Sequence, residues 1–356
     1  MLFALLAATR HRPVVRLGRT VVVHGTDAFR QALTRVPLDR TAPGTTGAAA
    51  KTALSRGTPG TPGGDAPAGV LFDQDGSGHR TARRAVGHDL GAAGVAALRP
   101  LWRQVLDRRL APLAHPGGTV DLADVAREVA GTTVCALLRL DADPWAVTAA
   151  AAEAAAAAVR EHLPGPRRPG PRVAAAAARL EALLGSAAAE DHALRAMLAT
   201  AAVTTTVAAL PRAAAWCADA GLWADAADPG LRPLLVGELL RVVAPSPLLP
   251  RVAAAGSTVA GCPVRPGDRL VLVARHAVRA HAMDPDCRRP ACPADSQLVF
   301  GAGPHACPGA RLARAQLADL LAALAPHRPG VVRARADRHA ALPGWRTLVL
   351  RAGQAR

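Results

Sequence analysis

A cysteine at position 307 lies in a glycine-rich stretch, in a setting that favours its thiolate form. The stretch reads Phe-Gly-Ala-Gly-Pro-His-Ala-Cys-Pro-Gly over residues 300–309. Leucines from Leu312 to Leu324 repeat at helical spacing, which predicts a helix over about residues 309–325. Unpaired N–H groups at a helix start favour an anion, so a thiol there is readily ionised. Cys307 is therefore a candidate metal ligand, and the glycines let a flat, bulky group approach.

This stretch resembles the haem-thiolate loop of the cytochrome P450 superfamily. The family pattern Phe-Gly-x-Gly-x-His-x-Cys-x-Gly has six fixed positions, and all six match. The resemblance implies that Cys307 is the axial iron ligand of haem b, because a thiolate ligand favours O–O cleavage. It also implies haem contacts for Phe300, Gly301, His305 and Gly309. Without the resemblance, a buried free cysteine in a turn is the alternative interpretation.

The composition predicts helices. Half of the 356 residues are hydrophobic, only 3% are aromatic, and alanine supplies much of the apolar content. The resemblance implies a mainly α, cytochrome P450-like helical fold with a small β region, in one domain over residues 1–356. It is nearest to the soluble bacterial type and implies a small-molecule substrate.

The chain is strongly basic, with 43 Lys and Arg against 27 Asp and Glu and a formal net charge of +16. Such a charge often indicates nucleic-acid binding. Here the arginines are spread along the chain and do not alternate with aromatic residues. We therefore expect no nucleic acid as partner, and an acidic protein or high-GC codon usage explains the charge as well.

The apolar start of the chain, residues 1–8, is shorter than the roughly 20 residues that span a bilayer. It also lacks the preceding positive charge of a signal peptide. Six cysteines show no spacing typical of a disulfide framework, which favours free thiols in a reducing compartment. We expect a cytoplasmic protein without a membrane partner.

Two short strands, at residues 14–17 and 20–24, and a helix over 26–34 open the chain, like the β region of the family. Residues 37–70 are rich in Pro, Gly, Thr and Ala and predict a long loop. In the family the corresponding loop covers the substrate, whereas a low-complexity insert is the alternative here. His79 and Arg83 follow, four residues apart on one helix face. The resemblance implies that they bind the haem propionates.

Helices are predicted at about residues 92–113, 121–139, 144–162 and 172–186. The alanine-rich part of this region matches the family's active-site lid, but it is shorter than usual. A central helix is predicted over residues 191–219. The family pattern there ends in an acid and a threonine, which relay protons to iron-bound oxygen. Thr204 stands at the acid position and Thr205 at the hydroxyl position, so this helix departs from the pattern. Back-bonding to helix carbonyls is the alternative role for both threonines.

Glu238 and Arg241 lie at i and i+3 on a helix predicted over about 231–243 and can pair. The family has a buried Glu-x-x-Arg pair here, and Arg288 or Arg289 would be its third member. We interpret this pair as structural. The next strand carries Arg251, which the resemblance assigns to a haem propionate.

Three hypotheses for the function remain open. The first is a haem-thiolate oxidoreductase of the monooxygenase type, which activates O₂ near Thr205 with electrons from a ferredoxin-type partner. It would act on a small organic molecule in specialised metabolism. The second, motivated by Thr204, is an enzyme that uses peroxide or catalyses a redox-neutral reaction. The third is a haem protein without enzymatic activity that binds a ligand or a carrier protein.

Overall fold

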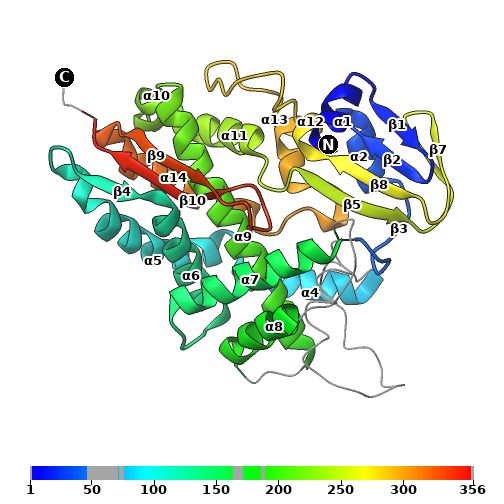
Figure 1. Ribbon diagram of the computed structural model, residues 1–356, viewed down its shortest axis with the longest axis horizontal. Helices are drawn as coiled ribbons and strands as arrows, with labels where there is room; N and C mark the ends of the chain where they lie inside the picture. The colour runs from blue at the N-terminus through cyan, green and yellow to red at the C-terminus, as the bar shows by residue number, and fades with distance from the viewer. Residues whose placement is uncertain (1, 46–70, 72–75, 163–170, 186–188, 354–356) are drawn as a thin grey trace. The chain divides into compact units, whose positions relative to one another are not determined.

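The computed structural model describes residues 2–45, 71, 76–162, 171–185 and 189–353. By packing, the chain divides into two compact units (Figure 1). The first unit is Met1–Ala48 with Gly237–Cys307, and the second is Ala49–Val236 with Pro308–Arg356. The prediction of one domain over residues 1–356 stays a prediction. Most of the predicted loop over residues 37–70 lies outside the described residues.

The first unit is built on a five-stranded sheet in the order β1-β2-β8-β5-β3. β1 and β2 form the predicted hairpin, and Gly18 at its turn has φ +59°, which favours glycine. β2 and β8 run parallel, whereas the other neighbours are antiparallel. The strands are β1 Val14–Leu17, β2 Thr20–Val23, β3 Leu38–Asp39, β5 Leu248–Ala253 and β8 Arg269–Val273. The smaller elements are β6 Ser257–Val259, β7 Cys262–Val264, α1 Leu2–Thr9, α2 Thr26–Thr34, α12 Ala274–Ala277 and α13 Pro293–Ser296.

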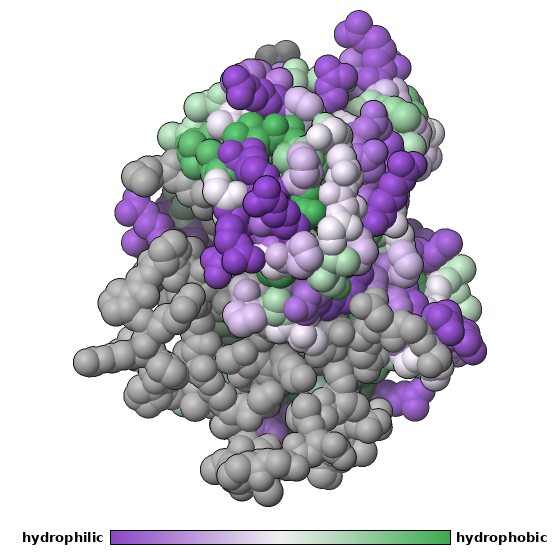
Figure 2. Space-filling model, turned by 90° about the vertical axis from the view of Figure 1, so that its right-hand side faces the viewer, coloured by the Kyte–Doolittle hydropathy of each residue, from purple (hydrophilic) through white to green (hydrophobic). Residues whose placement is uncertain are grey.

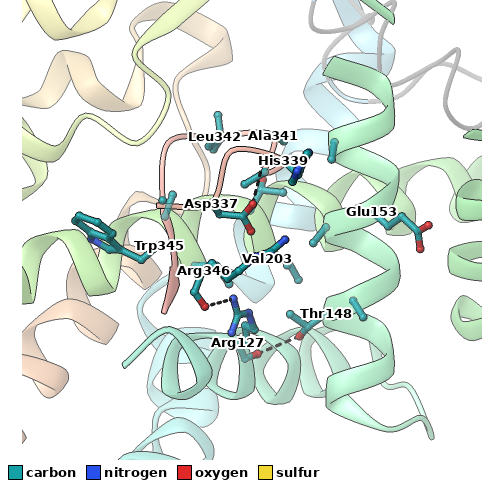
Figure 3. Close-up of a pocket in the computed structure, with 18 of the residues that line it drawn as sticks. Arg127, Thr148, Glu153, Val203, Asp337, His339, Ala341, Leu342, Trp345 and Arg346 are labelled. Atoms are coloured by element: carbon teal, nitrogen blue, oxygen red, sulfur yellow. Dashed lines mark hydrogen bonds between the residues drawn. The ribbon is translucent and has the colours of Figure 1, made fainter. Parts of the chain in front are cut away.

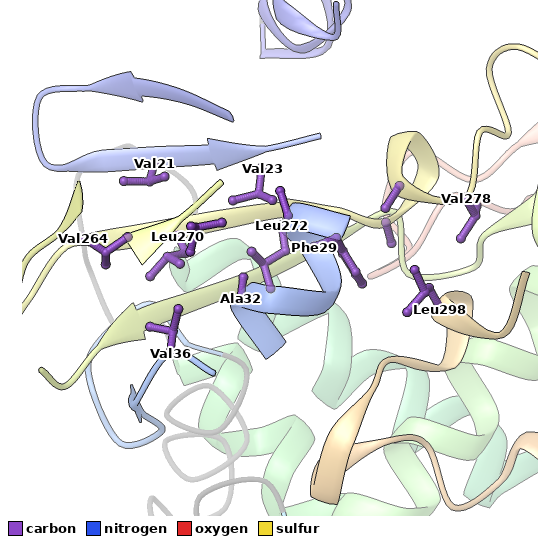
Figure 4. Packing of buried hydrophobic residues seen from close by; sticks show 14 of the residues in the cluster. Val21, Val23, Phe29, Ala32, Val36, Val264, Leu270, Leu272, Val278 and Leu298 are labelled. Carbon is purple, nitrogen blue, oxygen red and sulfur yellow. The ribbon is translucent and has the colours of Figure 1, made fainter. Parts of the chain in front are cut away.

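One face of this sheet and helix α2 enclose the core of the first unit (Figure 4). Val21 and Leu270 are fully buried on neighbouring strands, opposite Phe29 and Ala32 of α2. Val21 and Val23 of β2 belong to this core, whereas Val22 between them is buried in a second cluster with Leu6, as the period of two in a strand requires. Leu298, just ahead of the glycine-rich loop, belongs to the same cluster, so the loop starts from a packed base.

Helix α11, Arg232–Val243, carries the predicted Glu238–Arg241 pair, and the structure confirms it. The Arg241 Nη2 atom donates to Glu238 Oε2 at 2.6 Å, and both side chains are buried. Arg241 also donates to carbonyl oxygens of four further residues, and Glu238 accepts from two backbone N–H groups. The carbonyls belong to Val278, Arg279, Met283 and Asp284, and the N–H groups to Asp286 and Ala291. Arg289, a predicted third member, pairs with Asp286 on the surface.

Three histidines of the first unit lie in contact. The His24 and His276 rings have centroids 4.9 Å apart, and those of His276 and His281 are 4.8 Å apart. The Nδ1 atoms of His24 and His276 are 2.8 Å apart, and His24 Nε2 lies 3.0 Å from the hydroxyl of Thr9. Since that hydroxyl donates to Leu5 O at 2.8 Å, it accepts from His24 Nε2. His24 Nδ1 is then the acceptor, and neutral His276 donates to it.

We expect the first unit to lose stability in mild acid because of this pair. Burial lowers the pKa of His24, and burial with the charge of His24 lowers the pKa of His276 to about 4. The unfolded chain binds these protons near pH 6.5, so stability is full above about pH 6.5 and falls as the pH drops toward about 4. Further positive charge near the three rings comes from His11, Arg10, Arg275 and Arg279.

Urea unfolding between about pH 7.5 and pH 4.5 measures this effect. In His276→Asn, the fall in unfolding free energy with acid should be smaller than in the natural chain. An equal fall in both proteins would show that the pair does not sense pH.

The second unit is mostly helical, and the mainly α prediction is confirmed. Its helices are α4 Gly76–Asp89, α5 Ala92–Leu110, α6 Leu122–Leu138, α7 Pro144–His162, α8 Pro171–Leu184, α9 Ala189–Asp219, α10 Trp223–Ala227 and α14 Ala310–Leu324. β4 Thr119–Asp121, β9 Gly330–Ala336 and β10 Trp345–Arg351 form a sheet in the order β4-β10-β9. The β9 strand was not predicted, because Arg333 and Arg335 interrupt the apolar pattern from which a strand is recognised.

Helix α9 runs through the second unit and packs against α6, α7 and α14. Over His192–Asp219 it is long and apolar enough to cross a membrane, a property that buried core helices share. Its packing against these helices and α8 explains its apolar character here.

Hydrophilic residues on the face drawn in Figure 2 lie in several separate groups between apolar ones. This agrees with the even spread of arginine along the sequence and with the absence of a single basic run in it.

Candidate functional site

The Cys307 loop lies in the first unit and is shaped by two glycines with positive φ. Gly301 has φ +77° and Gly303 has φ +71°, values that other residues adopt only with strain. Two 3-10 turns, Gln297–Phe300 and Gly303–His305, flank these bends. The Cys307 N–H donates to Phe300 O at 2.7 Å, which closes the loop. The side chain of Cys307 is exposed. The loop thus gathers the four predicted residues Phe300, Gly301, His305 and Cys307.

The loop is fixed against helix α2. A Cβ atom added to Gly303 would lie 3.4 Å from Thr34 Cγ2 and 3.6 Å from Leu33 O. A methyl group at 303 would make ordinary contact with α2, so it is the positive φ of this position that favours glycine. Glycine at this position keeps the loop close to the core of its own unit.

Arg251 lies on β5 in the same unit and is half-buried. Burial, followed by the positive charge of Arg40, lowers the pKa of Arg251 to about 10. Its Nη1 atom donates to Pro250 O at 2.8 Å. Two guanidinium groups that repel each other in a partly buried setting form an environment that suits an anion. The guanidinium groups of Arg251 and Arg40 are suited to pair with the carboxylates of a haem. The exposed sulfur of Cys307 is suited to ligate its iron.

The other predicted cofactor residues are placed in the second unit. His79 and Arg83 both lie on α4, and His79 is buried whereas Arg83 is half-buried. Gly309 is the N-cap residue of α14. Helix α14 is held to α5 by the buried carboxylate of Asp319, which accepts from Arg99 Nη2 at 2.6 Å and from Trp102 Nε1 at 2.9 Å. Sequence reasoning missed this anchor, because its partners are over 200 residues apart.

The threonines of α9 use their hydroxyl protons within the helix. Thr204 donates to Thr200 O and Thr205 donates to Ala201 O, each at 2.8 Å. The back-bonding alternative is therefore confirmed for both. It leaves their hydroxyl oxygens as acceptors, and no carboxylate stands at position 204.

Thr206, which was not predicted as a site residue, connects α9 to its neighbours. Its hydroxyl lies 3.5 Å from Gln316 Oε1, and Gln316 Nε2 donates to Thr133 Oγ1 at 2.9 Å. Gln316 and Thr133 are buried on α14 and α6. These contacts connect α9 to α14 and, through Gln316, to α6.

A cavity of about 330 Å³ opens beside Thr204 in the second unit (Figure 3). Its walls come from α6, α7, α9 and the segment that joins β9 to β10. Alanines of α7 and Val203 and Val207 of α9 supply apolar surface, and Arg127, Asp337 and Arg346 supply charge. Sequence reasoning missed this cavity, although the repeated alanines at helical spacing were a signal that α7 leaves space beside it.

No family model matches this chain. The 20-oxo-5-O-mycaminosyltylactone 23-monooxygenase of Streptomyces fradiae is 36% identical over 106 residues, which are 29% of this chain. The match spans only 25% of that enzyme.

Solved structures match this chain over almost its whole length. The epothilone B-bound cytochrome P450epoK has a TM-score of 0.78 and 19% identity, covering 99% of this chain and 96% of that one. The cytochrome P450 CYP109B1 from Bacillus subtilis has a TM-score of 0.74 and 17% identity, covering 99% of both chains. The chain therefore has the cytochrome P450 fold, as the Cys307 loop predicted.

Proposed function

We propose that this chain is a haem-thiolate oxidoreductase of the monooxygenase type that acts on a small organic molecule. The observation that carries the proposal is the Cys307 loop, whose six-position motif occurs in a chain with the cytochrome P450 fold and contains an exposed cysteine. The curated relative is itself named a monooxygenase. Haem b, when bound through a thiolate, supplies the chemistry of O–O bond cleavage.

The residues of the chain would then have separate roles. Cys307 ligates the iron, while Phe300, Gly301 and Gly309 shape the loop around it. Arg251 and His305 would bind the haem propionates. An anion beside Arg251 would offset the burial and the repulsion from Arg40 that lower its pKa. His79 and Arg83 are proposed for the same role on the strength of their motif alone.

The electron donor would be a ferredoxin-type protein with an acidic surface. The formal net charge of +16 supports this choice, because complementary charge accelerates association. We expect a soluble, cytoplasmic enzyme, in line with the soluble type of P450 that the sequence resembles.

The absorbance spectrum of the purified protein, reduced and exposed to CO, tests the proposal. A thiolate-type ferrous–CO band is the expected result. A protein that takes up no haem would overturn the proposal, because the proposed reaction depends on that group.

The use of peroxide is a second candidate, which the Thr204 geometry favours. Turnover with O₂ would need an acid or an ordered proton donor in this helix, and the hydroxyl protons of Thr204 and Thr205 are held by the helix's own carbonyl groups. We expect H₂O₂ to support turnover of a fluorogenic aryl ether. We expect Thr204→Asp to raise turnover with NAD(P)H and redox partners by about ten- to a hundredfold.

Thr204→Val is the matched control, because it keeps the shape and adds no acid. It should show no gain in turnover with NAD(P)H and redox partners. If Thr204→Asp gives no gain with redox partners, position 204 does not limit proton delivery. If neither oxidant gives product while the thiolate-type band is normal, the non-enzymatic hypothesis is favoured.

A further inference from the structure

The cavity beside Thr204 has one apolar wall made by small side chains. Ala149, Ala152 and Ala156 follow one another at spacings of three and four residues on α7, so they share one helix face. A methyl group at each of these positions leaves room that a larger side chain would fill. Val203 and Val207 of α9 face the same space. At about 330 Å³, the cavity is at the small end of ligand pockets and suits a compact apolar body.

Most charges that line this cavity are already balanced. Arg127 Nη1 donates to Asp124 Oδ1 at 2.6 Å, and Arg127 Nη2 donates to Arg346 O at 3.0 Å. Glu153 pairs with Arg179 at 2.7 Å, and Figure 3 shows its side chain pointing away from the other labelled residues. Arg346 is exposed, so water solvates its guanidinium group. These groups carry little net attraction for a ligand inside the cavity.

Asp337 is the exception, and Figure 3 places it among the lining residues, at the start of the β9–β10 connection. It is half-buried, and its Oδ1 atom accepts the His339 N–H at 2.9 Å. Among the described residues, no Arg, Lys or His nitrogen lies within 4.0 Å of its carboxylate. A partly desolvated carboxylate without a cation is unusual in a chain of net charge +16.

We propose that this cavity binds a small organic molecule with a cationic amine, which Asp337 recognises, beside an apolar body that packs on the alanines of α7. The ammonium group would donate to the free oxygen of the Asp337 carboxylate in a charge-assisted hydrogen bond. This inference rests on the proposed function in one respect, because it names the substrate class of the same enzyme. Binding itself requires only the second unit's residues.

Calorimetric titration of the full protein near pH 7 tests the proposal with three probes of one shape. The probes are 4-phenylbutylamine, 4-phenylbutan-1-ol and 4-phenylbutanoate, of which the first is a cation and the last an anion at this pH. We expect the amine to bind at least about tenfold tighter than the alcohol, since hydrogen bonds to charged groups are the stronger ones. The carboxylate should bind weakest.

Three variants locate the effect. Asp337→Asn keeps the shape and should remove the preference for the amine. Glu153→Gln is the matched control, because that carboxylate borders the cavity but is already paired, and it should keep the preference. Ala152→Phe fills the apolar wall and should weaken all three probes together.

Tighter binding of the carboxylate, or an amine preference that survives Asp337→Asn, would overturn the proposal. Absence of binding by all three probes would also count against it. The ferrous–CO spectrum is recorded for each variant, so the two proposals can fail separately. A normal spectrum without amine preference contradicts only the proposed substrate class. Amine preference without a thiolate-type band contradicts only the proposed haem function.

Discussion

The Cys307→Ser protein is expected to lose the thiolate-type ferrous–CO band completely. Serine keeps the size of the side chain but replaces the soft sulfur ligand with a hydroxyl, which is a poor ligand for haem iron. The loop itself should persist, because its bends depend on Gly301 and Gly303 and on the Cys307 N–H, none of which change. Absorbance spectra of the reduced protein under CO measure the loss.

Cys292→Ser is the matched control for this experiment. Cys292 is also an exposed free thiol of the first unit, but it lies outside the glycine-rich loop. Its replacement should leave the spectrum unchanged. If Cys307→Ser retained the natural band, the sulfur of residue 307 would not be the ligand, and the proposed function would lose its main support.

Replacing Arg241 with methionine should destabilise the protein by about 3–5 kcal/mol, enough to unfold a marginal domain. Methionine would leave the Glu238 carboxylate buried with only backbone N–H partners at Asp286 and Ala291. It would also remove the donors that four carbonyl groups share. The midpoint of urea unfolding, followed by circular dichroism, measures the effect.

Arg289→Met is the matched control, since Arg289 forms an exposed pair with Asp286. That change should alter stability by less than about 1 kcal/mol. A double variant, Glu238→Leu with Arg241→Met, should recover part of the loss because no buried charge is left alone. Equal effects of Arg241→Met and Arg289→Met would contradict the structural role of the buried pair.

The sequence predicted those parts of the fold that depend on neighbouring residues. The Cys307 motif, the β1–β2 hairpin and the Glu238–Arg241 pair each lie within a few residues of chain, so spacing alone revealed them. The long helices α5, α6, α7 and α9 were also predicted with nearly correct bounds. Helical periodicity and capping signals act over the same short range.

What the sequence did not reveal depends on residues that are distant in the chain. The contact of His24 with His276 joins residues 252 positions apart, and Asp319 meets Trp102 across 217. The role of Thr205 is a different case. Its position matched the family pattern, but whether its hydroxyl faces its own helix is decided by rotamer and packing, which spacing does not encode.

The parallel pairing of β2 with β8 has a consequence for how this protein is made. β2 finds its partner only when residues about 250 positions later have been synthesised, as the Arg16–Asp268 contact across 252 positions illustrates. At about 5–20 residues per second, that interval is roughly 10–50 s. A two-stranded hairpin is marginal alone in water, so during this interval the valine-rich strand β2 lacks its partner β8. Chaperone occupancy during translation should therefore be highest on this segment.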